Sequence, residues 1–289
     1  MKLKQIYELA VQLGAEAVPI GGKDFPDCQV LNLPQAEVKT IYAGIDIGVG
    51  ELLLIDKLRS CGQRIDAVLS HHPLAKAAYL MAEVARIQEK NWVRCGVDRG
   101  VARKLADKLI REASLEAGSA NYLQVRDSAR LLGLPLMSLH TALDNLVQKF
   151  FIDLLADKEN DSLEQVLENI RSIEECRISS EDGVKPYSAG KADPKAKLGS
   201  CLVDMTGGLD PPSEIFDYLT EAGIDTMVGM HYGMENIKAM EESGMACLVC
   251  GHMAGDSIGI NLFCDQLAAR GIEVIAGSGL YRVERLDHD

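Results

Sequence analysis

Five of the six histidines in this sequence lie at or just after the end of a predicted strand. A neutral imidazole binds transition metals well, and the same ring can carry a proton near neutral pH. In open α/β sheets, ligands bind at the carboxyl ends of the strands. We therefore predict that one sheet edge gathers His71, His72, His140, His231 and His252. The sixth, His288, lies in the C-terminal tail and is expected to be solvated.

Three of these histidines are followed by a carboxylate four residues later. On a helix, residues i and i+4 share a face, so an imidazole nitrogen and a carboxylate oxygen can meet one cation. A single pair of this kind can also be a plain hydrogen bond. The pairs are His140 with Asp144, His252 with Asp256, and His231 with Glu235.

The adjacent His71 and His72 add a different feature, because neighbouring side chains at a strand end diverge. One imidazole could then serve each of two metals. Imidazole and carboxylate without thiolate suit Zn²⁺, Mn²⁺, Fe²⁺, Co²⁺ or Ni²⁺ and not Ca²⁺. Two such ions about 3.5–4 Å apart would activate a water molecule for hydrolysis.

Alternating strand and helix patterns must position these side chains. Continuous apolar strands separated by helices predict parallel sheets covered on both faces. Strands are predicted over 38–47, 65–70, 134–140, 198–205, 225–230, 247–250 and 272–275, and helices over 3–14, 51–62, 75–132, 145–157, 211–222, 234–243 and 257–270. Pro73 ends the strand before the double histidine because it has no N–H for the ladder.

A polar stretch with glycines and prolines divides the chain into two predicted α/β domains with largely parallel sheets. They are an N-terminal domain over 1–177 with a long helical insertion, a linker over 178–197, and a C-terminal domain over 198–289. The charged face of the insertion is interpreted as solvated or interhelical, with an anion-binding or oligomer-facing surface as the alternative.

Other motifs carry weaker predictions. Cys247 and Cys250 form the one C-x-x-C, which we interpret as part of a buried strand, with a redox dithiol as the alternative. Gly44, Gly48 and Gly50 lack the order of a dinucleotide fingerprint and fit a tight turn. The Gly207-Gly208 turn could cradle an anion at the next helix.

The composition limits the class of protein. Hydrophobic residues make up 47% of the chain, which supports a real core. A net charge of −13 argues against nucleic-acid binding, which needs clustered Lys and Arg. No secretory h-region and no long apolar run occurs, so we expect a cytoplasmic protein without membrane contact.

Three segments carry a resemblance to a known family. Leu69-Ser-His-His-Pro-Leu74, Leu139-His-Thr-Ala-Leu-Asp144 and Cys250-Gly-His-Met-Ala-Gly-Asp256 resemble the signatures of the NIF-three-like (NGG-one-interacting-factor-three-like) family, whose members are also called GTP cyclohydrolase 1 type 2 homologues. The resemblance covers roughly 40–150 and 198–270.

This resemblance implies two divalent transition-metal ions in a cleft between two α/β domains, usually in a homohexamer. The implied ligands are His71, His72, Asp144, His252 and Asp256. His140 and His231 would then lie beside the metals as catalytic proton carriers. The family has Glu where this chain has Asp256, a methylene shorter, so Glu235 is the alternative source of the last carboxylate.

The predicted function is that of a metal-dependent hydrolase acting on a small phosphorylated or heterocyclic, nucleotide-like molecule. The alternative is a non-catalytic metal-binding, metal-delivery or regulatory protein that acts through partners. A dinucleotide-dependent oxidoreductase is the third hypothesis.

Overall fold

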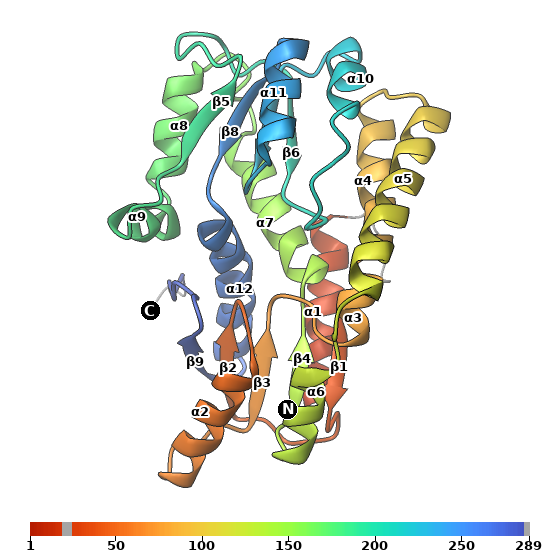
Figure 1. Ribbon diagram of the computed structural model, residues 1–289. Helices are drawn as coiled ribbons and strands as arrows, with labels where there is room; N and C mark the ends of the chain where they lie inside the picture. Colours follow the sequence, from red (N-terminus) through yellow and green to blue (C-terminus); the bar gives the residue numbers. More distant parts are fainter. Residues whose placement is uncertain (19–24, 286–289) are drawn as a thin grey trace.

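The computed structural model describes residues 1–18 and 25–285 and contains two mixed sheets, each covered by helices (Figure 1). The first sheet has five strands, in the spatial order β1-β4-β3-β2-β9. All of its neighbours pair in parallel except β1 and β4, which are antiparallel. Its strands are β1 (Gln29–Asn32), β2 (Thr40–Gly44), β3 (Ala67–Ser70), β4 (Leu136–Ser138) and β9 (Glu273–Gly277).

The second sheet has four strands, in the order β5-β8-β7-β6. Only the edge strand β5 runs antiparallel to its neighbour. Its strands are β5 (Tyr187–Gly190), β6 (Cys201–Asp204), β7 (Thr226–Gly229) and β8 (Ala246–Val249). The predicted α/β class with largely parallel sheets is therefore confirmed.

Helices cover both sheets, and those between β3 and β4 form the insertion expected from the sequence (Figure 1). They are α1 (Leu3–Ala17), α2 (Val49–Ser60), α3 (Lys76–Leu80), the 3₁₀ turn η1 (Met81–Val84), α4 (Ala85–Arg94), α5 (Arg99–Gly118), α6 (Gln124–Leu131), α7 (Thr141–Leu154), α8 (Leu163–Arg171), α9 (Glu174–Glu181), α10 (Ile215–Glu221), α11 (Met234–Ser243) and α12 (His252–Ala268).

Helices α7 and α12 connect the two sheets. The core under the first sheet takes Leu143 from α7 and Phe263 from α12, and the core under the second takes Phe151 and Ile258 from the same two helices. A Cβ on Gly259 of α12 would lie only 2.6 Å from the Leu143 carbonyl oxygen, so the absent side chain permits this close packing. The site residues on α7 and α12 therefore stand on well-packed helices.

Two features differ from the sequence-based organisation. The segment 178–197, predicted as a linker, contains β5, whose residues pair with β8 at the edge of the second sheet. Strand β9 pairs with β2 and so returns to the first sheet. Residues from both sides of the predicted boundary thus share one sheet, because parallel pairing ignores sequence distance.

The insertion over 75–132, predicted to be almost wholly helical, consists of four helices and a 3₁₀ turn. Its charges meet each other: Arg86 bonds Glu89 at 2.9 Å on α4 and Asp107 of α5 at 2.5 Å. This agrees with the interhelical interpretation of the charged face. Within the described residues, no helix is long and apolar enough to cross a membrane. His288 lies outside the described residues.

Candidate metal centre

His71 and His72 directly follow β3 at the carboxyl edge of the first sheet. Their backbone N–H groups donate to the carbonyl oxygens of Gly44 and Ile45, which continues the pairing with β2 for two residues. Pro73 then ends the ladder. His71 is fully buried, whereas the side chain of His72 is 26% exposed.

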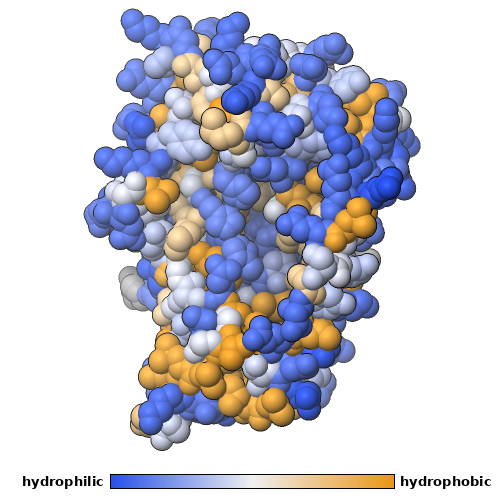
Figure 2. All heavy atoms as spheres, in the orientation of Figure 1, coloured by the Kyte–Doolittle hydropathy of each residue, from blue (hydrophilic) through white to orange (hydrophobic). Residues whose placement is uncertain are grey.

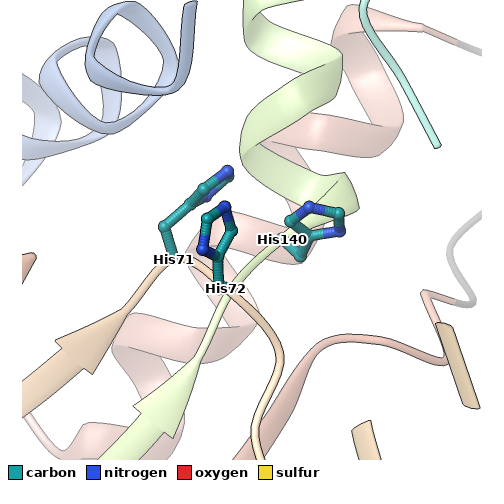
Figure 3. A group of neighbouring side chains, drawn as sticks. All are labelled: His71, His72 and His140. Carbon is teal, nitrogen blue, oxygen red and sulfur yellow. The ribbon is translucent and has the colours of Figure 1, made fainter. Parts of the chain in front are cut away.

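Asp144 lies in the first turn of α7, and His140 is the residue that caps this helix. The helix begins at Thr141, four residues earlier than predicted, so the i+4 spacing from His140 brings Asp144 to the same end of the helix. Figure 3 shows the rings of His71, His72 and His140 gathered between the end of β3 and the start of α7.

His252 and Asp256 lie in the first turns of α12. The sequence predicted this helix from residue 257, but it begins at His252, immediately after Gly251. Gly251 has φ +97°, a conformation that glycine adopts without strain and that turns the chain from β8 into α12. The i+4 spacing then directs His252 and Asp256 toward the same point, with His252 Nε2 3.3 Å from Asp256 Oδ2.

Two groups of potential ligands share Asp256. In the first, His71 Nε2 lies 3.3 Å from Asp144 Oδ1 and 3.5 Å from Asp256 Oδ1. In the second, Asp256 Oδ2 lies 3.3 Å from both His72 Nε2 and His252 Nε2, which are 3.1 Å apart. Each oxygen of the Asp256 carboxylate thus faces a different set.

The hydrogen bonds of the outer ring nitrogens fix which inner nitrogens carry lone pairs. His71 Nδ1 lies 3.0 Å from the Leu139 carbonyl oxygen, and His72 Nδ1 lies 2.6 Å from Asp46 Oδ1. Both partners are acceptors, so each Nδ1 carries the proton. In the neutral ring each Nε2 then directs a lone pair at carboxylate oxygens, an arrangement that requires a cation or an extra proton between them.

Several of these buried atoms have no hydrogen-bond partner among the described residues: His71 Nε2, Asp144 Oδ1, Asp256 Oδ2 and His252 Nδ1. A buried polar atom without a partner is costly unless something else satisfies it. Donors 2.0–2.1 Å from a tetrahedral ion lie roughly 3.3 Å apart. The observed separations of 3.1–3.5 Å match that spacing, so the residues fit a metal ion.

The electrostatics of the centre also favour a bound cation. Burial lowers the pKa of His71, but Asp256 and Asp144 outweigh it and hold the pKa well above its usual value. Burial raises the pKa of Asp256, yet the histidines around it hold the pKa far below the usual range. The two carboxylates thus favour a positive charge at this point, which a metal ion can supply.

His140 is held by a carboxylate that sequence analysis missed. Asp27 Oδ2 lies 2.7 Å from His140 Nδ1 and also accepts from the Thr141 hydroxyl at 2.6 Å. The ring therefore presents Nε2 to Asp144 Oδ2, 3.6 Å away. Burial raises the pKa of Asp27, but His140 and Thr141 outweigh it and lower the pKa. The ring of His140 is thus fixed, and with His71 and His72 it forms a third group of potential ligands whose atoms lie within 4.8 Å of one another.

His231 lies beside His252. Its ring centroid is 5.0 Å from that of His252, and its side chain is 48% exposed. Glu235 does not join the ligand groups; it accepts a hydrogen bond from Ser213 at 3.2 Å on the exposed surface. The geometry therefore brings Asp256, rather than Glu235, to the histidines.

A small pocket with a volume of about 40 Å³ opens beside the ligands, between the carboxyl ends of strands from the second sheet and helices α4, α7 and α12. Figure 2 shows a hollow in the middle of the molecule, with many hydrophilic and some hydrophobic residues around it. The lining includes Gln88, His140, Asp144, Asp204, Gly208, Asp210, His231, Tyr232, His252 and Asp256. A Cβ on Gly208 would lie 2.4 Å from the His140 ring, so this turn packs directly against the imidazole.

The polar residues of this region that were not predicted from the sequence include Asp27, Asp46, Gln88 and Asp204. Asp46 and Asp204 could have been found, because each lies at or just after the end of a strand, like the histidines. Asp27 and Gln88 come from a loop and from the middle of a helix, where no pattern marks them.

Cys247 and Cys250 are buried free thiols and pack in two different hydrophobic clusters. The strand interpretation of this C-x-x-C is therefore supported. Neither cysteine is a member of the ligand groups found in the described residues.

Solved structures share this fold. A NIF3 superfamily protein from Sphaerobacter thermophilus is 25% identical with a TM-score of 0.80, over 94% of this chain and 98% of that chain. Reduced HcgD from Methanocaldococcus jannaschii is 17% identical with a TM-score of 0.58, over 96% and 97% of the two chains. TTHA1606 from Thermus thermophilus is 14% identical with a TM-score of 0.53, over 99% and 100%.

No family model matches the sequence, and no curated protein matches it either. The two more distant structures show the fold alone. The Sphaerobacter structure agrees over nearly the whole of both chains, and the double histidine and the two H-x-x-x-D pairs resemble the family signatures. The chain therefore has the fold of this NIF3 superfamily protein.

Proposed function

We propose that this protein binds two divalent transition-metal ions and is a hydrolase of a small phosphorylated or heterocyclic molecule. The observation that carries the proposal is the position of Asp256, whose two oxygens face two different sets of ligands. One buried carboxylate between two sets of imidazole and carboxylate donors is suited to holding two ions close together. Zn²⁺, Mn²⁺, Fe²⁺, Co²⁺ and Ni²⁺ all suit this donor set.

Each ion has its own residues in this proposal. His71, Asp144 and Asp256 Oδ1 would hold one, and His72, His252 and Asp256 Oδ2 the other. When bound, such a pair of ions supplies Lewis-acid activation of water and of the substrate. The protein holds the donors rigidly because they stand on β3, α7 and α12.

Two histidines beside the ligands are suited to moving protons. The Nδ1–H of His140 is held by Asp27, so only Nε2 is free to exchange a proton at the pocket. His231 is half-exposed at the pocket rim and can exchange its proton with solvent. We therefore propose His140 as the inner and His231 as the outer proton carrier.

Metal content tests the first half of the proposal. Protein purified without chelator is expected to hold about two ions per chain. Asp256→Asn, which weakens both sets, is expected to lower this content more than Asp144→Asn, which touches one. Glu235→Gln is the matched control, since its carboxylate lies outside both groups. A content below about 0.2 ions per chain that added metal does not restore would refute the site.

Turnover tests the second half. The metal-loaded protein should hydrolyse at least one member of a panel of phosphoesters, nucleotides and cyclic amides, and His140→Gln should reduce kcat with metal content unchanged. If both ions are bound and the whole panel stays intact, the hydrolase proposal is wrong. A metal-binding protein acting through partners would then be favoured if His71→Ala changes partner binding.

A further inference from the structure

The pocket wall that faces the candidate metal ligands is rich in hydrogen-bond acceptors. Asp204, Asp210 and Gln88 all line it. Of the described residues that line the pocket, none is a lysine or an arginine. A phosphate group is normally recognised by such cations or by backbone N–H groups at a helix N-terminus. This wall has the opposite character.

Gln88 is the most specific part of the wall. Its side chain comes from α4, is 1% exposed, and donates from Nε2 to the Leu209 carbonyl oxygen at 2.8 Å. Gly207, at φ +127°, lets the turn approach this amide, because a Cβ there would lie 3.1 Å from Gln88 Cδ. The donor contact fixes the amide orientation and leaves Oε1 buried without a hydrogen-bond partner among the described residues.

An unpaired buried acceptor of this kind needs an N–H or O–H donor. Water or a ligand can supply it. The protein tolerates the cost of the unpaired oxygen at a pocket beside its candidate metal centre, which is the position expected of a group that recognises a ligand.

Asp204 is the second acceptor. It is the last residue of β6 and its Oδ2 accepts from the Tyr232 hydroxyl at 3.5 Å. Its other oxygen accepts no hydrogen bond from the described residues. Burial, with a further contribution from Asp210, raises the pKa of this carboxyl to about 7. An N–H donor beside it would stabilise the ionised form, whereas a phosphate would oppose it.

Resting on the proposed function, we propose that Gln88 and Asp204 select a cyclic amide or cyclic urea through its N–H groups, in preference to a phosphoester. The two acceptors in this lining can take the two N–H donors of a cyclic urea, or one of them the single N–H of a cyclic amide. At this wall, on the side away from the proposed metal ions, a phosphate would instead bring negative charge toward Asp204 and Asp210, and no lysine or arginine among the described lining residues would balance it.

The reaction that follows from this substrate is simple hydrolysis. Water supplies the oxygen of the new C–O bond, the C–N bond of the ring breaks, and the released nitrogen takes a proton that originates from the same water. The second proton of the water passes to the amine or to solvent, so the products are an amine and a carboxylate from a cyclic amide, or an amine and a carbamate from a cyclic urea. No oxidant or reductant is required.

Binding of two small probes to the whole protein tests the proposal. 2-Imidazolidinone is the cyclic urea, methyl phosphate is the phosphoester, and each is titrated by ligand-observed NMR with and without Zn²⁺. The wild-type protein is expected to bind the cyclic urea more tightly than methyl phosphate. Gln88→Met and Asp204→Asn are each expected to weaken cyclic urea binding about tenfold, the effect of one lost charge-assisted or buried hydrogen bond.

The reasons for the two losses differ. Gln88→Met removes the acceptor and keeps the length of the side chain. In Asp204→Asn, the Tyr232 hydroxyl donates to the amide oxygen, so the amide N–H groups face the N–H groups of the ring. Glu235→Gln, a carboxylate change outside this pocket, should leave both affinities unchanged. The two variants are read separately, so a folding defect in one leaves the other informative.

Tighter binding of methyl phosphate, or wild-type cyclic urea affinity in both well-folded variants, would overturn the inference. Zinc content is measured for every sample, which separates the two proposals. If the protein holds no zinc, the proposed function fails while the metal-free titrations still test the wall. If zinc is bound and the variants have no effect, only the inference about the wall fails.

Discussion

The carboxylate of Asp46 gives the sharpest test of the two-group arrangement. It lies in the loop after β2 and accepts from His72 Nδ1 at 2.6 Å, while its own backbone carbonyl accepts from the Ser278 hydroxyl. His71 does not depend on it, because the Leu139 carbonyl oxygen holds that ring. Asp46→Ala should therefore weaken metal binding at the His72 group and leave the His71 group intact.

The size of the effect follows from the exposure of the carboxylate. Loss of a carboxylate behind a ligating histidine costs about 10–100-fold in metal affinity. The Asp46 side chain is 77% exposed, so water can partly replace it, and the low end of that range applies. We expect about a tenfold loss, equivalent to about 1.4 kcal/mol.

The measurement is a Zn²⁺ titration in competition with a chromogenic chelator, analysed as two successive binding steps. One step should weaken about tenfold in Asp46→Ala and the other should not change. Asp56→Ala on α2 is the control, because its carboxylate makes no ion pair with the described histidines. Equal weakening of both steps, or no change in either, would show that the two groups are not oriented separately.

Two further predictions concern stability. Arg285→Met should cost about 3–5 kcal/mol of unfolding free energy in urea at pH 7, because the fully buried Glu175 loses a two-point ion pair at 2.5 and 2.6 Å. Arg177→Met removes an exposed ion pair and should cost much less, and equal costs would contradict the role of burial. Burial and Asp210 raise the pKa of Asp204 from 3.8 to about 7. Ionisation of this carboxyl therefore destabilises the folded state progressively from about pH 4 to pH 7, and by a constant amount above pH 7. In urea unfolding, Asp204→Asn should be more stable than wild type by on the order of 2 kcal/mol at pH 8 and equal to it at pH 4; the same difference at both pH values would refute this.

The strand ends were predictable because the strands leave a strong local signal. Residues 67–70 and 246–249 are buried throughout, and a short apolar run marks such strands in the sequence. Their ends locate His71, His72 and His252. The alternation of strands and helices likewise predicts mainly parallel sheets.

The start of α12 was not predictable from the same kind of signal. Gly255 in its first turns has low helix propensity, and the pattern indicated a helix only from residue 257. Packing explains why position 255 is a glycine, because a Cβ there would lie 2.7 Å from Met230 Cγ. Tertiary contact here outweighs local preference.

Long-range partners were also beyond the sequence patterns. Asp27 bonds a histidine 113 residues later, and Gln88 bonds a carbonyl 121 residues later. The glycines and prolines of 178–197 indicated a linker, yet four of these residues form β5 because β8 offers a free edge. The homohexamer and the hydrolytic activity stay predictions, which mass measurement in solution and the substrate panel can check.

The pairing of β9 with β2 has a consequence for how the protein is made. Thr40 and Glu273 pair across 233 residues, whereas the four strands of the second sheet all lie between residues 187 and 249. During synthesis the second sheet can form before β9 exists, so one edge of β2 is still unpaired at that time. An open edge of a buried strand is a template for pairing with other chains. The first sheet is therefore expected to form more slowly than the second and to be more prone to aggregation, because it is completed only after residues 273–277 have been synthesised.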